Sequence, residues 1–143
     1  MRSVLVLLAL SACAPSLSQQ SLAPPGRAAR LEEVMGFWSV KYYKVEVSQG
    51  VALALTCDEN GPCRNVSVVS DDPAIAETRP ASLVAMQAIS FTAQAPASAF
   101  VIVGKHPGTT RLHVHAKRSR EIVVTVVAPP PPANEQKAAT AAR

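Results

Sequence analysis

Aromatic side chains are scarce in this chain of 143 residues, at 4% of its composition, whereas 12 residues are proline. Alanine and valine are frequent, and this mixture suits short strands joined by turns better than long helices. The apolar stretch at residues 4–10 is far shorter than the roughly 20 residues that a helix needs to cross a bilayer. The composition therefore favours one small domain of the all-β class and few helices.

Sequence signatures of catalysis are also missing. No serine lies in a nucleophile elbow, and no glycine-rich loop is present to cradle a phosphate. The acidic pairs Glu32-Glu33 and Asp71-Asp72 are adjacent, so their side chains point apart and do not suit general acid and base chemistry. Lys and Arg number 14 against 10 Asp and Glu, and this modest excess does not by itself suggest nucleic acid as a partner. We expect a protein that is not an enzyme and assign no catalytic residue.

Cysteine is rare, with three in the chain, and the first of them stands in an informative place. Cys13 closes the run Leu-Ser-Ala-Cys behind the apolar residues 4–10, and Arg2 supplies a small positive n-region. This order resembles the lipobox of bacterial lipoproteins. The resemblance implies that residues 1–12 are a signal peptide and that the Cys13 thiol carries diacylglycerol, with the new amino terminus usually acylated as well.

The same resemblance implies where the protein is sent. Ala14 stands where lipoproteins retained in the inner membrane carry aspartate, which favours the outer membrane in a bacterium that has two membranes. We expect membrane attachment through this covalent lipid and no other cofactor. The alternative is an ordinary secretory signal that a cysteine follows by accident.

Cys57 and Cys63 are separated by five residues that include Asn-Gly and Pro, which favour a tight reversal of the chain. An exported compartment is oxidising enough for two cysteines to pair. The spacing is not Cys-x-x-Cys, and no second pair completes a zinc site. The sequence therefore predicts a disulfide that staples the end of one hairpin.

Composition and periodicity predict where the folded domain and its flanking segments lie in the rest of the chain. Residues 13–30 are rich in Ser, Pro and Gln and lack apolar periodicity, which predicts a flexible tether. Residues 31–40 place apolar side chains at helical spacing and predict a possible short amphipathic helix. Residues 129–143 begin with prolines and continue as a polar, alanine-rich stretch, which predicts a disordered tail. The folded domain is then expected at residues 41–128.

Alternating apolar and polar side chains begin at residue 41. They predict strands at residues 41–47, 51–55, 66–70, 75–78, 99–103, 110–117 and 122–127. About seven short strands at this spacing predict an immunoglobulin-like β-sandwich. Residues 82–97 fit either a strand pair or a strand with a helical turn. An aromatic cluster near the tether either caps one end of the core or lies at a membrane or partner interface; its members are Phe37, Trp38, Tyr42 and Tyr43.

The order of these segments resembles a bacterial immunoglobulin-like domain of group 2 over most of residues 41–128. Residues 68–76 read Val-Val-Ser-Asp-Asp-Pro-Ala-Ile-Ala, and residues 107–110 read Pro-Gly-Thr-Thr before an alternating strand. Val68 departs from the family, which commonly has tryptophan there. Such domains occur in adhesins, in envelope proteins and beside secretin-type channels, where they bind or space without catalysing. The resemblance implies no catalytic residue.

The last predicted hairpin is rich in cationic side chains, because no acidic residue occurs between Glu77 and Glu121. We expect it to carry a basic strip that binds an anionic envelope partner, such as lipid headgroups, an acidic glycan or an acidic protein surface. Alternatively, its charges only deter edge-to-edge pairing of strands. The candidate binding residues are Arg111, His113, His115, Lys117, Arg118 and Arg120. Two histidines on one strand face suggest a metal, but the flanking cations disfavour one, and no metal site is assigned.

Taken together, these features predict a lipid-anchored, non-enzymatic envelope protein of the outer membrane that acts as an adhesion, scaffold or accessory binding module. The alternative is a periplasmic accessory subunit of a secretion or pilus channel complex. An envelope protein complex or an anionic glycan is the expected partner, and the sequence does not define the oligomeric state.

Overall fold

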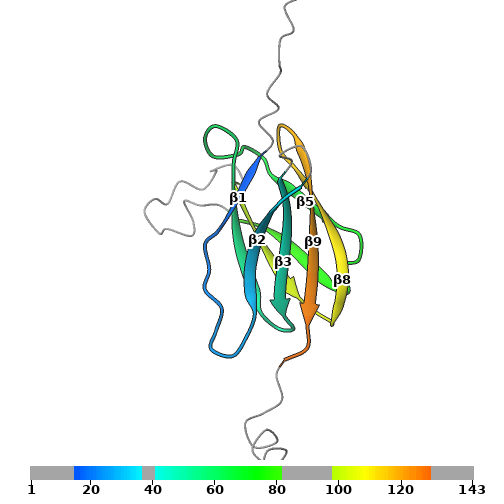
Figure 1. Cartoon of the computed structure of the whole chain (residues 1–143). Helices are drawn as coiled ribbons and strands as arrows, with labels where there is room; N and C mark the ends of the chain where they lie inside the picture. The colour runs from blue at the N-terminus through cyan, green and yellow to red at the C-terminus, as the bar shows by residue number, and fades with distance from the viewer. Residues whose placement is uncertain (1–14, 37–40, 82–97, 130–143) are drawn as a thin grey trace, which may run out of the picture.

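The computed structural model describes residues 15–36, 41–81 and 98–129, and these form two β-sheets packed into a sandwich (Figure 1). All regular structure in these ranges is β-strand, which confirms the all-β prediction. The strands are β1 (Ser16–Gln19), β2 (Ala29–Met35), β3 (Lys41–Ser48), β4 (Ala52–Asp58), β5 (Ser67–Ser70), β6 (Ala76–Ala81), β7 (Ala99–Gly104), β8 (Gly108–His115) and β9 (Ser119–Val127).

One sheet has four strands in the order β1-β4-β7-β6, and the other has five in the order β2-β3-β9-β8-β5. Neighbouring strands are antiparallel except β3 and β9, which run parallel from Tyr43↔Ile122 to Ser48↔Val127. The described residues 41–81 and 98–128 contain seven strands, β3 to β9, which agrees with the predicted number of about seven. Within the described ranges, no helix is both long enough and apolar enough to cross a membrane.

The core lies between the two sheets because each inner strand alternates buried and outward side chains. In β8, Thr110, Leu112 and Val114 are buried, as the alternation predicted. Facing strands of the two sheets supply the rest of the apolar contact, and their largest fully buried side chains are Tyr43, Val45, Val47, Leu53, Leu55, Phe100, Ile102, Ile122 and Val124. Burying these side chains supplies the main driving force for folding of the sandwich.

Two strands at the N-terminal side correct the predicted organisation. β1 lies inside the tether expected at residues 13–30 and pairs with β4 from Ser16↔Asp58 to Gln19↔Leu55. Pro15 and Leu17 are buried, so the folded domain includes residues from Pro15 onward and is not confined to residues 41–128. Ser16–Gln19 has only one apolar side chain, and its stability comes from pairing with the β4 edge, which no local pattern reports.

β2 corrects the expected helix over residues 31–40 in its described part. It pairs with β3 along its whole length, from Ala29↔Val47 to Met35↔Lys41. An isolated helix of this length is marginal in water, whereas the edge of β3 offers backbone hydrogen bonds to seven residues. Tertiary pairing therefore prevails over the helical spacing of the apolar residues.

The predicted signal peptide, Cys13, Phe37 and Trp38 lie outside the described residues. So do the open segment 82–97 and the predicted tail after Pro129.

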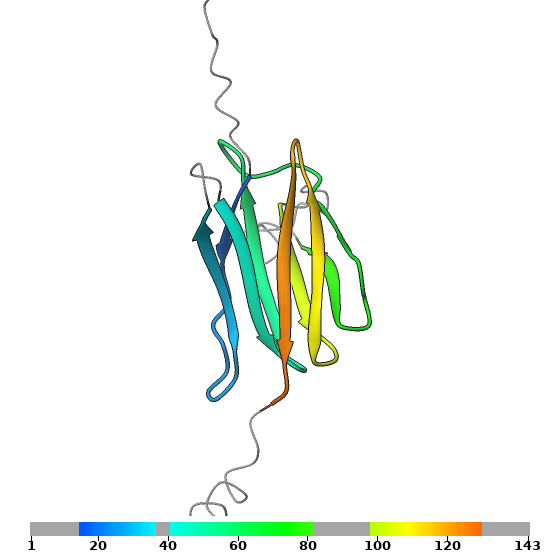
Figure 2. The same ribbon diagram turned by 45° about the vertical axis from the view of Figure 1, so that its right-hand side comes forward.

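The sandwich has two distinct ends. We call one the N-terminal pole: it comprises the start of β1, the end of β4 with the loop 59–66, the β2–β3 end and the β8–β9 turn. The pairs Ser16↔Asp58, Met35↔Lys41 and His115↔Ser119 place these elements together, and Figure 2 shows the β8–β9 turn at the same end as the start of β1. β9 ends at Val127 at the opposite end, which we call the C-terminal pole (Figure 1).

Candidate functional site

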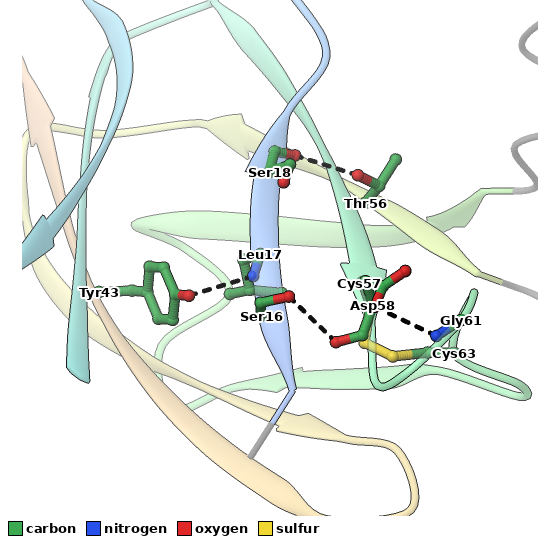
Figure 3. The surroundings of a disulfide bond; sticks show 9 residues. All are labelled: Ser16, Leu17, Ser18, Tyr43, Thr56, Cys57, Asp58, Gly61 and Cys63. Atoms are coloured by element: carbon green, nitrogen blue, oxygen red, sulfur yellow. Dashed lines mark hydrogen bonds between the residues drawn. A yellow bond between two sulfur atoms is a disulfide. The ribbon is translucent and has the colours of Figure 1, made fainter. Parts of the chain in front are cut away.

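The predicted disulfide is confirmed. Cys57 and Cys63 are bonded at a Cα–Cα distance of 5.3 Å, and the Cys63 amide donates to the Cys57 carbonyl at 3.0 Å. The turn between them has Asn60 at φ 60°, a conformation that asparagine tolerates. The Gly61 amide donates to Asp58 Oδ1 at 3.2 Å (Figure 3). Both cysteines belong to the core, so the staple joins the loop of the N-terminal pole to the sandwich.

Replacing Cys57 and Cys63 by alanine together is expected to lower the free energy of unfolding by about 2 kcal/mol. A loop of seven residues loses only modest entropy in the unfolded chain on closure. Urea unfolding followed by circular dichroism measures the loss, and wild-type protein under reducing conditions is the matched control. An unchanged unfolding midpoint in the double variant would contradict the prediction.

β1 is attached to both sheets by hydrogen bonds around Tyr43 and β4 (Figure 3). The Leu17 amide donates to the Tyr43 hydroxyl at 3.3 Å. On the β4 side, the Ser16 hydroxyl donates to the Asp58 carbonyl at 3.2 Å, and the Thr56 hydroxyl donates to the Ser18 carbonyl at 3.4 Å. These hydrogen bonds hold the first described residues of the chain against both sheets.

The two described members of the aromatic cluster differ in burial. Tyr43 is 2% exposed and caps the core, whereas Tyr42 is 54% exposed. The Tyr43 hydroxyl also donates to Glu33 Oε2 at 3.4 Å. The Arg120 guanidinium carbon lies 5.0 Å from the centre of the Tyr43 ring, within range of a cation–π contact.

Glu33 and Lys41 form an ion pair beside Tyr43, with Lys41 Nζ 2.7 Å from Glu33 Oε1. The hydrogen bond from Lys41 lowers the pKa of Glu33 below its ordinary value, and the same contact raises the pKa of Lys41. Because the folded-state pKa of Glu33 is lowered, the stability from this pair is present above the ordinary glutamate pKa and is lost as the pH falls through the lowered one.

The structure gives acidic partners to two side chains in the centre of the expected basic strip. Arg111 and His113 lie on the outer face of β8, as predicted, but each has an acidic partner: Arg111 Nη1 is 3.4 Å from Glu121 Oε1, and His113 Nε2 is 2.9 Å from Asp71 Oδ1. His115 Nδ1 is 3.0 Å from Ser119 Oγ. The outer face of β8 is thus largely neutralised and does not form a continuous cationic surface.

Arg120, another of the candidate binding residues, does not share this face. Its position in β9 has the same parity as the buried Ile122, so its side chain turns toward the core end, where Nη1 donates to the Lys41 carbonyl at 2.7 Å. Lys117 and Arg118 lie in the exposed β8–β9 turn, and neither makes an ion pair with any residue that the structure describes. The six candidate residues therefore form three groups. Arg111, His113 and His115 have partners on the outer face of β8, Arg120 lies over Tyr43, and Lys117 and Arg118 lie in the exposed turn without an ion pair to a described residue.

Asp71 and Glu121 are the residues of this surface that the sequence analysis missed. The position of Glu121 opposite His113 could have been predicted from the sequence by counting residues back from the hairpin turn. The contact of Asp71 could not, because it depends on β5 lying beside β8, where the Asp71 amide donates to the Arg111 carbonyl at 3.0 Å. In the three described ranges, no group of three or more His, Cys, Asp or Glu side chains is arranged to hold a metal ion.

No protein-family model matches the chain, and no curated protein matches it. Among solved structures, domains 4–9 of the surface layer protein SbsC are similar with a TM-score of 0.43 at 18% identity, over 73% of this chain and 15% of that chain. SbsC domains 4 and 5 give 0.41 at 17% identity, over 80% and 48% of the two chains. Domains 5–6 give 0.40 at 15% identity, over 78% and 45%. The chain spans less than half of each, and likeness at this level does not assign a function.

Proposed function

We propose that this protein is a lipid-anchored, non-enzymatic binding module of the bacterial envelope, held at the outer membrane through Cys13 and acting as an adhesin, scaffold or accessory subunit. The observation that carries the proposal is the position of Pro15. The folded domain begins two residues after the cysteine that closes the lipobox-like run, so a lipid at Cys13 would hold the domain itself at the membrane.

The surface chemistry supports a binding role over a catalytic one. A catalytic acid or base needs a free group that converges with a partner on a substrate. Four outward carboxylates are instead within 3.4 Å of a lysine or arginine nitrogen, and they belong to Glu33, Glu46, Glu77 and Glu121. The Asp71 carboxylate lies 2.9 Å from His113 Nε2.

The placement of the two ends of the domain supports a spacing or scaffolding role. The chain enters at the N-terminal pole and leaves the sandwich after Val127 at the C-terminal pole (Figure 1). A strand of nine residues such as β9 spans about 30 Å. A domain anchored at Cys13 would therefore present its C-terminal pole away from the membrane, where a partner can reach it.

Metabolic labelling with a palmitate analogue tests this function. In a bacterium with two membranes, the full chain is expected to incorporate the label and to require detergent for release, while Cys13→Ala is expected to lose the label and become soluble. The matched control is the double variant Cys57→Ala and Cys63→Ala, which removes the other two thiols and should keep the label. An unlabelled, soluble wild-type chain would refute the anchor.

Crosslinking of the labelled protein in its membranes, followed by pull-down, identifies what it binds. Recovery of an envelope complex from the wild type alone supports an anchored scaffold. Recovery of channel subunits specifically favours the accessory role in a secretion or pilus complex. Equal recovery from Cys13→Ala would mean that the lipid does not contribute to binding.

A further inference from the structure

The distance between Cys13 and the folded domain sets how far the domain can move from a membrane. Two residue steps, from Cys13 to Pro15, span at most about 7 Å even when fully extended. The Debye length at physiological ionic strength is about 8 Å. Side chains of the N-terminal pole that point toward the bilayer therefore lie within the field of its headgroups.

This pole carries an excess of basic side chains among the described residues. Its cationic members are Lys41, Arg64, Lys117, Arg118 and Arg120, and its acidic members are Glu33, Asp58, Glu59 and Glu121. The Glu33 carboxylate lies 2.7 Å from Lys41 Nζ, and the Glu121 carboxylate lies 3.4 Å from Nη1 of Arg111, which is outside the pole. The remaining charge of the pole is positive.

Three of these cations, Arg64, Lys117 and Arg118, are exposed and have no ion pair with a described residue, and Lys117 and Arg118 are adjacent. These two occupy the exposed tip of the β8–β9 hairpin, where the Ala116 amide donates to the Arg118 carbonyl at 3.1 Å and closes the turn. Neither is paired with a described carboxylate, so contact with an anionic surface would not break an existing ion pair. The loss of hydration is small for cations that remain at a wet headgroup layer.

Exposed apolar side chains lie at the same pole. Met35 is 66% exposed and Tyr42 is 54% exposed, and they occupy the last two rungs of the β2–β3 ladder, Met35↔Lys41 and Val34↔Tyr42. Tyrosine is suited to a membrane interface because its ring is apolar and its hydroxyl is hydrated. This pole therefore combines cationic and amphipathic groups, as membrane-surface segments do.

The C-terminal pole differs in charge. Its described charged side chains include Arg27, Lys105, Asp72 and Glu77, and the Glu77 carboxylate lies 3.0 Å from Lys105 Nζ and 2.8 Å from Arg79 Nε. Basic and acidic side chains therefore nearly balance here, and an anionic surface would attract this end less than the N-terminal pole. The two ends of one small domain are thus electrostatically distinct, with the positive one adjacent to the proposed lipid.

We propose that the N-terminal pole docks on an anionic lipid bilayer, with Lys117 and Arg118 against headgroup phosphates, so that the anchored domain stands upright on this pole. The proposal rests on the lipid at Cys13. Each basic residue near an anionic membrane strengthens binding by about five-fold. Two such residues would hold a domain without a lipid anchor only weakly at the membrane. The anchor makes docking intramolecular and raises the effective headgroup concentration, so two such residues are enough to favour one orientation.

Fluorescence quenching in reconstituted vesicles tests the orientation. The full lipidated chain carries a dye at Ser119→Cys, beside the hairpin tip, or at Ala74→Cys, in the β5–β6 turn of the C-terminal pole. Vesicles of phosphatidylcholine with phosphatidylglycerol carry a headgroup-linked quencher. Quenching is expected to be several-fold stronger at position 119 than at position 74, and the difference should shrink in pure phosphatidylcholine or at high salt.

A charge-matched pair of variants then isolates the cationic turn. Lys117→Gln with Arg118→Gln is expected to reduce the docking equilibrium by about 25-fold, whereas Arg27→Gln with Lys105→Gln, which has the same net charge, should leave it unchanged. Labelled protein with equal quenching at both dye positions, or equal effects of both double variants, would overturn docking while leaving the anchor intact. Absence of the palmitate label from Cys13 would overturn the proposed function and this inference together.

Discussion

Replacing Tyr43 by alanine is expected to lower the free energy of unfolding by about 3 to 5 kcal/mol, the loss typical of large aromatic side chains removed from a core. The ring is 2% exposed and packs at the end of the core. Its hydroxyl accepts the Leu17 amide of β1 and donates to Glu33 of β2, and Arg120 of β9 lies over the ring at 5.0 Å. The variant therefore leaves a cavity and releases contacts to three other strands.

Tyr43→Phe is the matched variant that separates the ring from its hydroxyl. It keeps the packed ring and removes only the hydrogen bonds, so a loss of about 1 kcal/mol is expected. Urea unfolding of both variants, with hydrogen exchange at the Leu17 amide, measures the two contributions. If Tyr43→Phe were as unstable as Tyr43→Ala, the hydroxyl network and not the packing would dominate, contrary to this expectation.

Gly104→Ala is expected to cost about 1 to 3 kcal/mol, as overpacking of a well-filled interior does. A Cβ at this position would lie 2.8 Å from the Ser48 carbonyl oxygen, 3.1 Å from Val126 Cγ1 and 3.3 Å from Val47 Cγ1. The Gly104 carbonyl also accepts the Gly50 amide at 2.8 Å. Here the end of β7 crosses close to β3 of the other sheet, and the two backbones cannot separate without losing this hydrogen bond.

A second substitution distinguishes the backbone contact from the side-chain contacts. Val126→Ala in the Gly104→Ala background removes the 3.1 Å contact but leaves the closer one to the Ser48 carbonyl. We expect no recovery of thermal stability in the double variant relative to Gly104→Ala. Restoration of the wild-type melting temperature would show that the side chain of Val126 causes the clash.

The sequence predicted correctly those features that depend on residues close together in the chain. The alternation from Thr110 to His115 predicted both the strand β8 and its buried face, because side chains of a strand alternate between core and solvent. The Asn-Gly and Pro between Cys57 and Cys63 predicted the reversal that brings the two sulfurs together, since those residues accept turn conformations without strain. Neither prediction required knowledge of a distant part of the chain.

Predictions failed where a distant segment decided the outcome. Ser16–Gln19 reads as a polar tether until β4 lies beside it, and residues 31–35 read as a helix until β3 offers its edge. The charge pairing on β8 also depends on a distant segment: Asp71 reaches His113 only because β5 pairs with β8. The sequence analysis assigned Arg120 to no strand face; its side chain follows the parity of the buried Ile122 in β9.

By itself, then, the sequence determined the all-β class, the seven strands seen in the described parts of residues 41–128 and the Cys57–Cys63 bridge, because each depends on side-chain periodicity or turn chemistry within a few residues. Only the tertiary structure decided that Pro15 and β1 belong to the sandwich and that the cationic turn lies at the same pole as Pro15. Those features depend on which strands pair, and strand pairing between distant segments is driven by burial of a shared core that no short stretch of sequence contains.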